Sequence, residues 1–345
     1  MIRKSILSSA VILAVISAGF LKADTGTAAF LDIGVGARAM GLGGAFTAVS
    51  DDATASYWNP AGLGKIESFQ SSLMFQGSGG LEWPGMEDIS PSYQFFNIVV
   101  PLERTGVYGR GAIALSLVRY SISSIPNTYI DSSGKISRST FNDAETAYFL
   151  SYGLPLFHKE FYLGGSLKLI SQDFTGIDGG SAFGWDADAG AIAQISPRLS
   201  LGCLFQKGAV LKWSSGYVDR DSLSTKIGMS YNYEISEKTG LLGVWDLIQQ
   251  RDTPLKTSAG IEFTCLLGFT AADYGRVSSA SLRAGIDRFT IENRYDYMSK
   301  LNRSINWNAG AGINLGVFNF DLQIDYTFSY MRLGSKHRVS LIIQI

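Results

Sequence analysis

Two histidines, His158 and His337, are the residues of this chain best suited to acid–base or metal chemistry. Nucleophilic catalysis at neutral pH generally pairs a Ser or Asp with a His, and zinc sites gather several His, Cys or acidic ligands. Neither histidine has a Cys, His or acidic partner at a metal-ligand spacing. Both fall at the ends of expected strands, His158 in a short turn. We therefore expect no catalytic residue, no metal and no cofactor.

A glycine cluster, 41–44, superficially resembles a phosphate-binding loop. It lacks the GxGxxG spacing, the preceding strand and the following acidic residue that dinucleotide binding requires. A turn and close backbone packing explain these glycines better. The formal net charge is −1, so a nucleic-acid surface is not expected either.

Charged residues recur on the strand faces that should point inward. Asp186 and Asp188 share one face of their segment. Two interpretations stay open. In the functional one, the opposed charges line a permeation path or hold an internal segment in place. In the structural one, they only neutralise one another in a water-filled lumen. The candidate lumen-lining residues are Asp186, Asp188, Lys226, Glu262, Arg283, Asp321 and Asp325, and further inward cations are Lys168, Lys256 and Arg338.

From Glu67 onward, apolar and polar residues alternate in segments of about ten residues, the pattern of a transmembrane barrel. The segments 222–233, 305–315 and 318–328 are the clearest. In 318–328, for example, Phe320, Leu322 and Ile324 share one face and Asp325 lies on the other. Weaker segments are 67–76, 92–101, 111–121, 144–154, 161–172, 184–194, 198–207, 239–248, 254–264, 280–287 and 336–345. The total is about fourteen strands.

The linkers also fit a barrel. Most linkers after even-numbered strands are short, as periplasmic turns are, and long ones follow odd-numbered strands, as outer loops do. The expected outer loops are 77–91, 122–143, 173–183, 208–221 and 288–303, while 249–253 and 265–279 break the rule. The segment 92–101 does not alternate, so no face is assigned to it.

A soluble β-sandwich is the alternative architecture, and the apolar faces argue against it. Phe, Trp, Tyr, Leu and Ile are frequent on nearly every strand, and only 17% of residues are charged. Fourteen such faces need more partner surface than 345 residues supply, whereas lipid supplies it directly. The expected fold is an all-β transmembrane antiparallel barrel over residues 67–345.

The first 23 residues are expected to be a secretory signal peptide. Arg3 and Lys4 form the charged start, and 6–20 is mostly apolar. Cleavage is expected after Ala23, with Ala18 as the alternative. The two cysteines, Cys203 and Cys265, lie in apolar strand-like contexts and read as small hydrophobes, although the sequence leaves a disulfide between them open.

Residues 24–66 do not alternate and form an expected hatch, or plug, inside the lumen. Ser50 or Asp51 is expected to cap one short helix, and Asn59 a second one with Pro60 at its first position. Glycines in this segment allow close backbone approach to neighbours. Arg38, Asp51 and Asp52 are the hatch residues expected to pair with wall charges.

Two blocks in this segment, 36–46 (Gly36-Ala37-Arg38 to Phe46) and 57–63 (Tyr57-Trp58-Asn59-Pro60-Ala61-Gly62-Leu63), resemble the N-terminal block of FadL-like outer-membrane proteins. The resemblance is closer to their PorV/PorQ-type branch. It implies a fourteen-stranded barrel with an internal hatch, whose motif includes Asn59, Pro60 and Ala61. The final residue, Ile345, departs from the aromatic that usually ends such barrels and that the barrel-assembly machinery reads.

The resemblance implies one of two functions, in the outer membrane of a diderm bacterium. The first, which we favour, is binding or passage of hydrophobic small molecules. A long apolar outer loop would support it, and the best candidate is 77–91, which also carries Glu82, Glu87 and Asp88. The second is a surface or secretion adaptor that binds a secreted or surface protein and transports nothing, which the mainly polar loop 122–143 favours. Membrane lipid and the barrel-assembly machinery are the other expected partners.

The alternation predicts that the mature protein fractionates with outer membranes and migrates faster on SDS gels when it is not heated, because a closed barrel resists SDS. Fractionation followed by heated and unheated electrophoresis checks this. Recovery in the soluble periplasm without a heat shift would contradict the architecture.

Overall fold

The computed structural model describes residues 27–78, 91–102, 111–130, 132–156, 160–251, 253–267, 278–290, 305–317, 319–331 and 334–345. The expected signal peptide, His158 and most of the expected loops 77–91, 265–279 and 288–303 lie outside these residues. Among the described residues, no helix is both long and apolar enough to cross a membrane.

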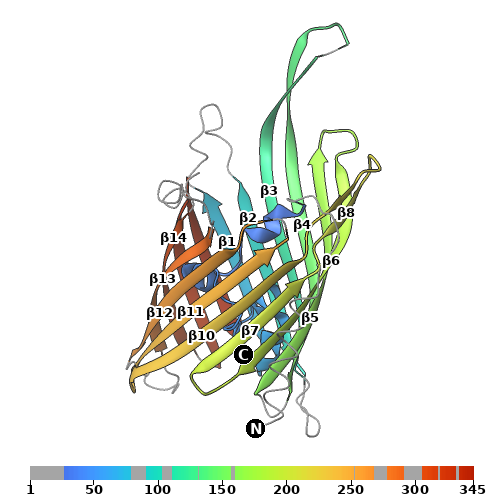
Figure 1. Ribbon diagram of the computed structural model, residues 1–345. Helices are drawn as coiled ribbons and strands as arrows, with labels where there is room; N and C mark the ends of the chain where they lie inside the picture. Colours follow the sequence, from blue (N-terminus) through green and yellow to red (C-terminus); the bar gives the residue numbers. More distant parts are fainter. Residues whose placement is uncertain are drawn as a thin grey trace, which may run out of the picture.

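The chain forms one antiparallel sheet that closes on itself through the β1–β16 and β5–β6 pairings (Figure 1). The strands are β1 (Gln70–Ser78), β2 (Ser92–Pro101), β3 (Ala112–Ile130), β4 (Ile136–Leu156), β5 (Phe161–Thr175), β6 (Ser181–Gln194), β7 (Leu199–Gln206), β8 (Val210–Trp213), β9 (Val218–Arg220), β10 (Ser224–Ser236), β11 (Thr239–Gln250), β12 (Lys256–Leu267), β13 (Ser278–Thr290), β14 (Asn306–Val317), β15 (Phe320–Met331) and β16 (Gly334–Gln344).

The barrel wall contains fourteen strands, as the sequence predicts. β8 continues β7 after a bulge in which residues 207–209 oppose only residues 186–187 of β6. Gly208 supplies the positive φ, +91°, at the centre of this bulge. β9 likewise leads into β10 through residues 221–223. The expected loop 208–221 is therefore wrong: it is the end of the β7–β10 hairpin.

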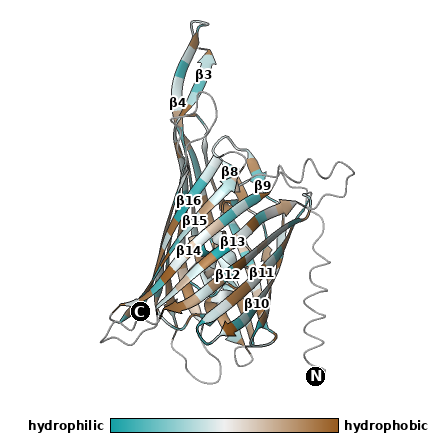
Figure 2. Cartoon of the chain, turned by 90° about the vertical axis from the view of Figure 1, so that its left-hand side faces the viewer, coloured by the Kyte–Doolittle hydropathy of each residue, from teal (hydrophilic) through white to brown (hydrophobic). Residues whose placement is uncertain are grey.

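The predicted faces of the clear segments are confirmed. On β15, Ile324 and Tyr326 are 42% and 41% exposed on the outside, whereas Asp325 and Thr327 are 1% and 0% exposed in the lumen. β10 and β14 follow the same rule, and apolar positions recur along the outside of the wall in Figure 2. An apolar outer surface on a closed barrel is suited to contact with lipid.

β2 explains why the segment 92–101 does not alternate. Tyr93, Phe95 and Val99 point inward and are at most 1% exposed, while Phe96 and Val100 point outward at 41% and 47%. Both faces are apolar because the inner face packs against the N-terminal segment instead of water. Apolar and polar residues alternate along a strand only when one of its faces contacts water, and neither face of this strand does.

The expected loop 122–143 is wrong as well. β3 and β4 continue through it as a hairpin that projects beyond the barrel (Figure 1), with pairs running from Ile125–Phe141 to Ile130–Ile136. A bulge between Ile122 and Ile125 marks where the hairpin leaves the wall. Beyond the membrane neither face meets lipid, so the polarity pattern that identifies barrel strands is lost. We call this end of the barrel the hairpin end.

Residues 27–66, here called the inner segment, lie inside the barrel (Figure 1). They contain η1 (Ala29–Asp32), α2 (Ala37–Gly41), α3 (Ala55–Trp58) and η2 (Pro60–Lys65). From Gly34 to Ile66 every residue is buried except for Arg38 and Lys65, which are half-buried, and Asp51, which is exposed. The helix expected to start at Ser50 or Asp51 starts later, at Ala55, because Asp52 instead accepts hydrogen bonds within the turn from Thr54.

An arginine at Ile324 should destabilise the barrel by about 2–4 kcal/mol if the position lies near the bilayer midplane, because a charge there must leave water for lipid. The neighbouring Gln323→Arg variant should cost little, because Gln323 faces the lumen, where its Nε2 bonds Asp325. Urea-driven unfolding of both variants in lipid vesicles measures the difference. Equal stability would mean that the faces are misassigned.

Candidate functional site

The inner segment touches the wall backbone to backbone across most of the barrel. At one glycine on each of several successive strands, an added Cβ would meet inner-segment atoms closer than real Cβ atoms come. At Gly164 on β5 it would meet the backbone of Pro60 and Ala61, and at Gly285 on β13 that of Leu42 and Gly43. We call these residues the glycine track: Gly153, Gly164, Gly190, Gly202, Gly228, Gly260 and Gly285. Only glycine permits so close an approach.

Asn59 joins the inner segment to the wall at the centre of this track. Its Oδ1 accepts from Ala61 N (3.1 Å) and caps η2, and Pro60 occupies the first position of that helix. Its Nδ2 donates to Thr47 O at 2.8 Å. It also reaches two wall carbonyls at 3.3 Å, those of Ala191 on β6 and Cys203 on β7. Ala61 itself is fully buried.

A chain of ion pairs fixes the inner segment on the opposite wall. Arg38 makes two 3.2 Å hydrogen bonds to Glu262 on β12 and bonds Asp51 (2.5 Å) and Asp52 (3.4 Å) within the inner segment. Glu262 also accepts from Arg283 on β13, whose Nη1 lies 2.6 Å from Asp325 Oδ1 on β15. Two guanidinium groups thus share four carboxylates, and most of these groups are buried. Removing one member leaves its partners uncompensated.

Burial and charge act in opposite directions on the ionisable groups of the inner segment. Burial alone would lower the pKa of Arg38, but Asp51, Glu262 and Asp52 outweigh it and hold that pKa well above its usual value. Burial raises the pKa of the Asp52 carboxyl group, against the opposing effect of Arg38. Burial lowers the pKa of Lys65, whose Nζ bonds the carbonyl of Val49. The Arg38 charge therefore persists at any physiological pH.

The remaining candidate residues predicted from the sequence do not lie in the Arg38 ion-pair chain. Lys168 on β5 bonds Asp186 (2.9 Å) and Asp188 (2.7 Å) on β6, which forms a second wall cluster away from Arg38. Lys226 lies 6.0 Å from the ring centroid of Trp58. Asp321 lies half-buried near the start of β15, opposite Gly316 and Gln344, and is not part of the Arg38 chain.

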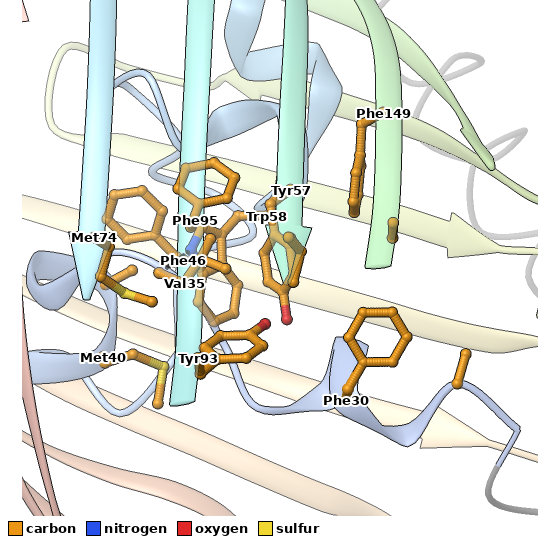
Figure 3. Packing of buried hydrophobic residues seen from close by; sticks show 14 of the residues in the cluster. Phe30, Val35, Met40, Phe46, Tyr57, Trp58, Met74, Tyr93, Phe95 and Phe149 are labelled. Atoms are coloured by element: carbon orange, nitrogen blue, oxygen red, sulfur yellow. Dashed lines mark hydrogen bonds between the residues drawn. The ribbon is translucent and has the colours of Figure 1, made fainter. Parts of the chain in front are cut away.

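An apolar cluster, which the sequence did not reveal, fills the lumen beside β1–β5 (Figure 3). Trp58 of the inner segment packs edge-to-face on Phe46 at 6.2 Å and on Tyr57 at 5.1 Å. Tyr57 in turn meets Phe149 of β4 at 6.1 Å. Wall members include Met74, Tyr93, Phe95, Val118, Phe149 and Ile170. The lack of alternation in 92–101 was the available signal.

Three of the cavities lined by described residues flank the inner segment, and polar side chains contribute to the lining of each. Two, of about 70 and 210 Å³, open toward the hairpin end and share Asp32 and Asp287. The third, of about 240 Å³, lies toward the short turns and is lined by Arg38, Glu262 and Arg283 among others. The inner segment therefore separates the hairpin-end cavities from the turn-end cavity.

The structure also shows that Cys203 and Cys265 do not form a disulfide. Cys203 is buried, Cys265 is half-buried, and both are free. His337 is exposed on β16, where its Nδ1 lies 2.7 Å from the Tyr326 hydroxyl. Among the described residues, no group of three or more His, Cys, Asp or Glu side chains could hold a metal ion.

Replacing Asn59 with alanine should loosen the inner segment while the barrel persists. Loss of the cap costs about 1 kcal/mol, and leaving buried carbonyls unpaired costs about 1–3 kcal/mol more. The strands bond to each other, so the heat shift should remain, while limited proteolysis should cut residues 27–66 faster. Asn232→Ala, an exposed wall change, is the control. Loss of the heat shift in Asn59→Ala would show that the inner segment is needed for barrel assembly.

No known protein family matches the sequence, and no curated protein does. Solved structures match its fold. The toluene transporter TodX of P. putida has a TM-score of 0.55 at 10% identity, covering 90% of this chain and 97% of that one. The monoaromatic hydrocarbon channel CymD gives 0.52 at 12% identity, with the same coverage. At these identities the likeness establishes the fold alone: a fourteen-stranded antiparallel barrel over nearly the whole chain.

Proposed function

We propose that this chain is an outer-membrane channel through which hydrophobic small molecules pass. The observation that carries the proposal is the architecture: a closed barrel with an apolar outer surface and an inner segment that separates cavities at its two ends. The fold is shared, over nearly the full length of each chain, with structures described as a monoaromatic hydrocarbon channel and a toluene transporter. The proposal assigns no chemical reaction to any residue.

The route has to pass the inner segment, which therefore acts as a hatch. The glycine track holds residues 42–61 against the wall at many points. By contrast, residues 27–36 are held by side-chain contacts, such as those of Leu31 O and Gly34 N with the Tyr57 hydroxyl. The part before α2 is thus the part whose movement costs fewest contacts. Arg38 lies between the two parts and is held by Asp51 and Asp52 of the second part.

The membrane location follows from the same surface. Outward apolar residues on the barrel strands need lipid, and short turns at one end with a long hairpin at the other fit insertion from the periplasmic side. An export signal over residues 1–23 and the barrel-assembly machinery belong to this proposal. Membership of the PorV/PorQ-type branch rests on the blocks 36–46 and 57–63.

A second candidate function is a surface adaptor that binds a secreted or surface protein. The observation that favours it is the β3–β4 hairpin, which projects beyond the barrel and exposes Tyr129, Ile130 and Ile136 at 47%, 74% and 75%. Exposed apolar residues that lie together on a surface often mark a site of protein contact. A channel needs no such projection.

Uptake of labelled toluene by diderm cells that express the chain, compared with cells carrying an empty vector, tests the proposal. Cells with the chain should take up toluene several-fold faster. Deletion of residues 124–142 discriminates between the two functions, because a channel should retain uptake without the hairpin. Uptake equal to the empty vector, with hairpin-dependent retention of a surface protein, would replace the channel by the adaptor.

A further inference from the structure

The larger cavity at the hairpin end, about 210 Å³, combines buried donors with an apolar side. It lies between the inner segment and strands β13–β16. Cavities of about 150 Å³ hold a benzene ring, so this one has room for a ring with a small substituent. Its lining includes Ile33, Met40, Asn308, Ser329, Met331 and Arg338.

Asn308 supplies the first donor. The side chain is 5% exposed, and its Oδ1 accepts a hydrogen bond from Ser329 Oγ. Its Nδ2 has no hydrogen-bond acceptor among the described residues. A buried amide N–H without an acceptor is energetically unfavourable. A ligand that brings an acceptor to this N–H would therefore bind with a more favourable free energy.

Arg338 supplies the second donor on the same side. It is 1% exposed, and its Nη1 donates to Ser329 Oγ at 2.7 Å, so it lies next to Asn308 across that hydroxyl. Its Nη2 reaches Ile33 O of the inner segment at 3.4 Å. A guanidinium beside an amide N–H forms a donor pair that suits a carboxylate or a carbonyl oxygen.

The other lining residues determine what ligand shape and what ligand charge the cavity accepts. Ile33, Met40 and Met331 offer an apolar surface that adapts to a small ring. Lys336 and Arg338 are balanced by Asp32 and Asp287, so net charge does not attract anions to the cavity. The choice of ligand therefore depends on the positions of the Asn308 and Arg338 donors and not on the net charge of the cavity.

We propose that this cavity binds a small molecule with an apolar body and one acceptor group, a carboxylate or a carbonyl, which bonds Asn308 and Arg338. The inference rests on the proposed channel function and specifies its substrate class: cargo is selected by an oxygen acceptor and not by apolar character alone. A ring of the same size without an acceptor leaves Asn308 unpaired and binds more weakly.

Three probes of matched size test this: benzoate (carboxylate), acetophenone (carbonyl) and toluene (no acceptor). Binding to the purified full-length protein in detergent is measured by titration calorimetry or saturation-transfer NMR. At least one acceptor probe should bind about tenfold more tightly than toluene, and the better of the two identifies the acceptor. In Asn308→Leu this advantage should disappear, while toluene binding stays unchanged.

Asn314→Leu is the matched control, because Asn314 lies on the same strand and face but lines the turn-end cavity. It should keep the acceptor preference. Asn308→Asp, which keeps the size and replaces the N–H donor, covers the case in which Leu disturbs folding, and the heat shift checks the barrel of each variant. It should weaken benzoate binding at least tenfold.

Toluene bound as tightly as both acceptor probes, or an equal loss of preference in Asn308→Leu and Asn314→Leu, would overturn the inference. Failure of the channel itself is distinguishable, because it appears as absent uptake of benzoate, acetophenone and toluene alike in cells that express the chain, whatever the binding data show. A chain that passes toluene yet shows no Asn308-dependent preference would retain the channel function and lose this substrate class.

Discussion

Contact between the backbone of the inner segment and the glycine track of the wall determines most of what this barrel can do. Because Gly164 and Gly285 have no Cβ, the segment from Leu42 to Ala61 lies directly on the strands. The inner segment therefore occupies much of the lumen, and three modest cavities lined by described residues flank it. Asn59 supplements this contact by pairing carbonyls on both surfaces.

The inner segment meets different chemistry on different parts of the wall. Beside β2 and β4 it packs against apolar side chains, because Trp58 and Tyr57 belong there to one cluster with Phe95 and Phe149. Beside β12–β15 the lumen is charged, because Arg38 needs the carboxylate of Glu262 once it is removed from water. An apolar ligand thus finds its apolar surface already occupied, and the open cavities offer donors. This arrangement supports the proposed preference for cargo with an acceptor group.

The strand count and the faces of β10, β14 and β15 could be predicted from sequence, because lipid outside and water inside impose period-2 polarity. The rule fails where its cause is absent. Phe95 faces an apolar inner segment, and residues 122–143 leave the membrane, so neither shows the pattern. Sequence identified Arg38 as a charge in need of a partner but could not choose Glu262, because several inward carboxylates are equivalent without a register. Asn308 resembles any other lumen asparagine until the cavity beside it is seen.

Hydrogen–deuterium exchange of residues 37–66 in Gly285→Ala tests the seating most directly. The added methyl group has no room against Leu42 and Gly43, so protection of the inner segment should fall by at least tenfold while the barrel strands keep theirs. Gly243→Ala is the control, because a Cβ there meets nothing within 4 Å. Unchanged protection in Gly285→Ala, equal to that of Gly243→Ala, would contradict the account, because it would mean that the inner segment does not rest on the glycine track.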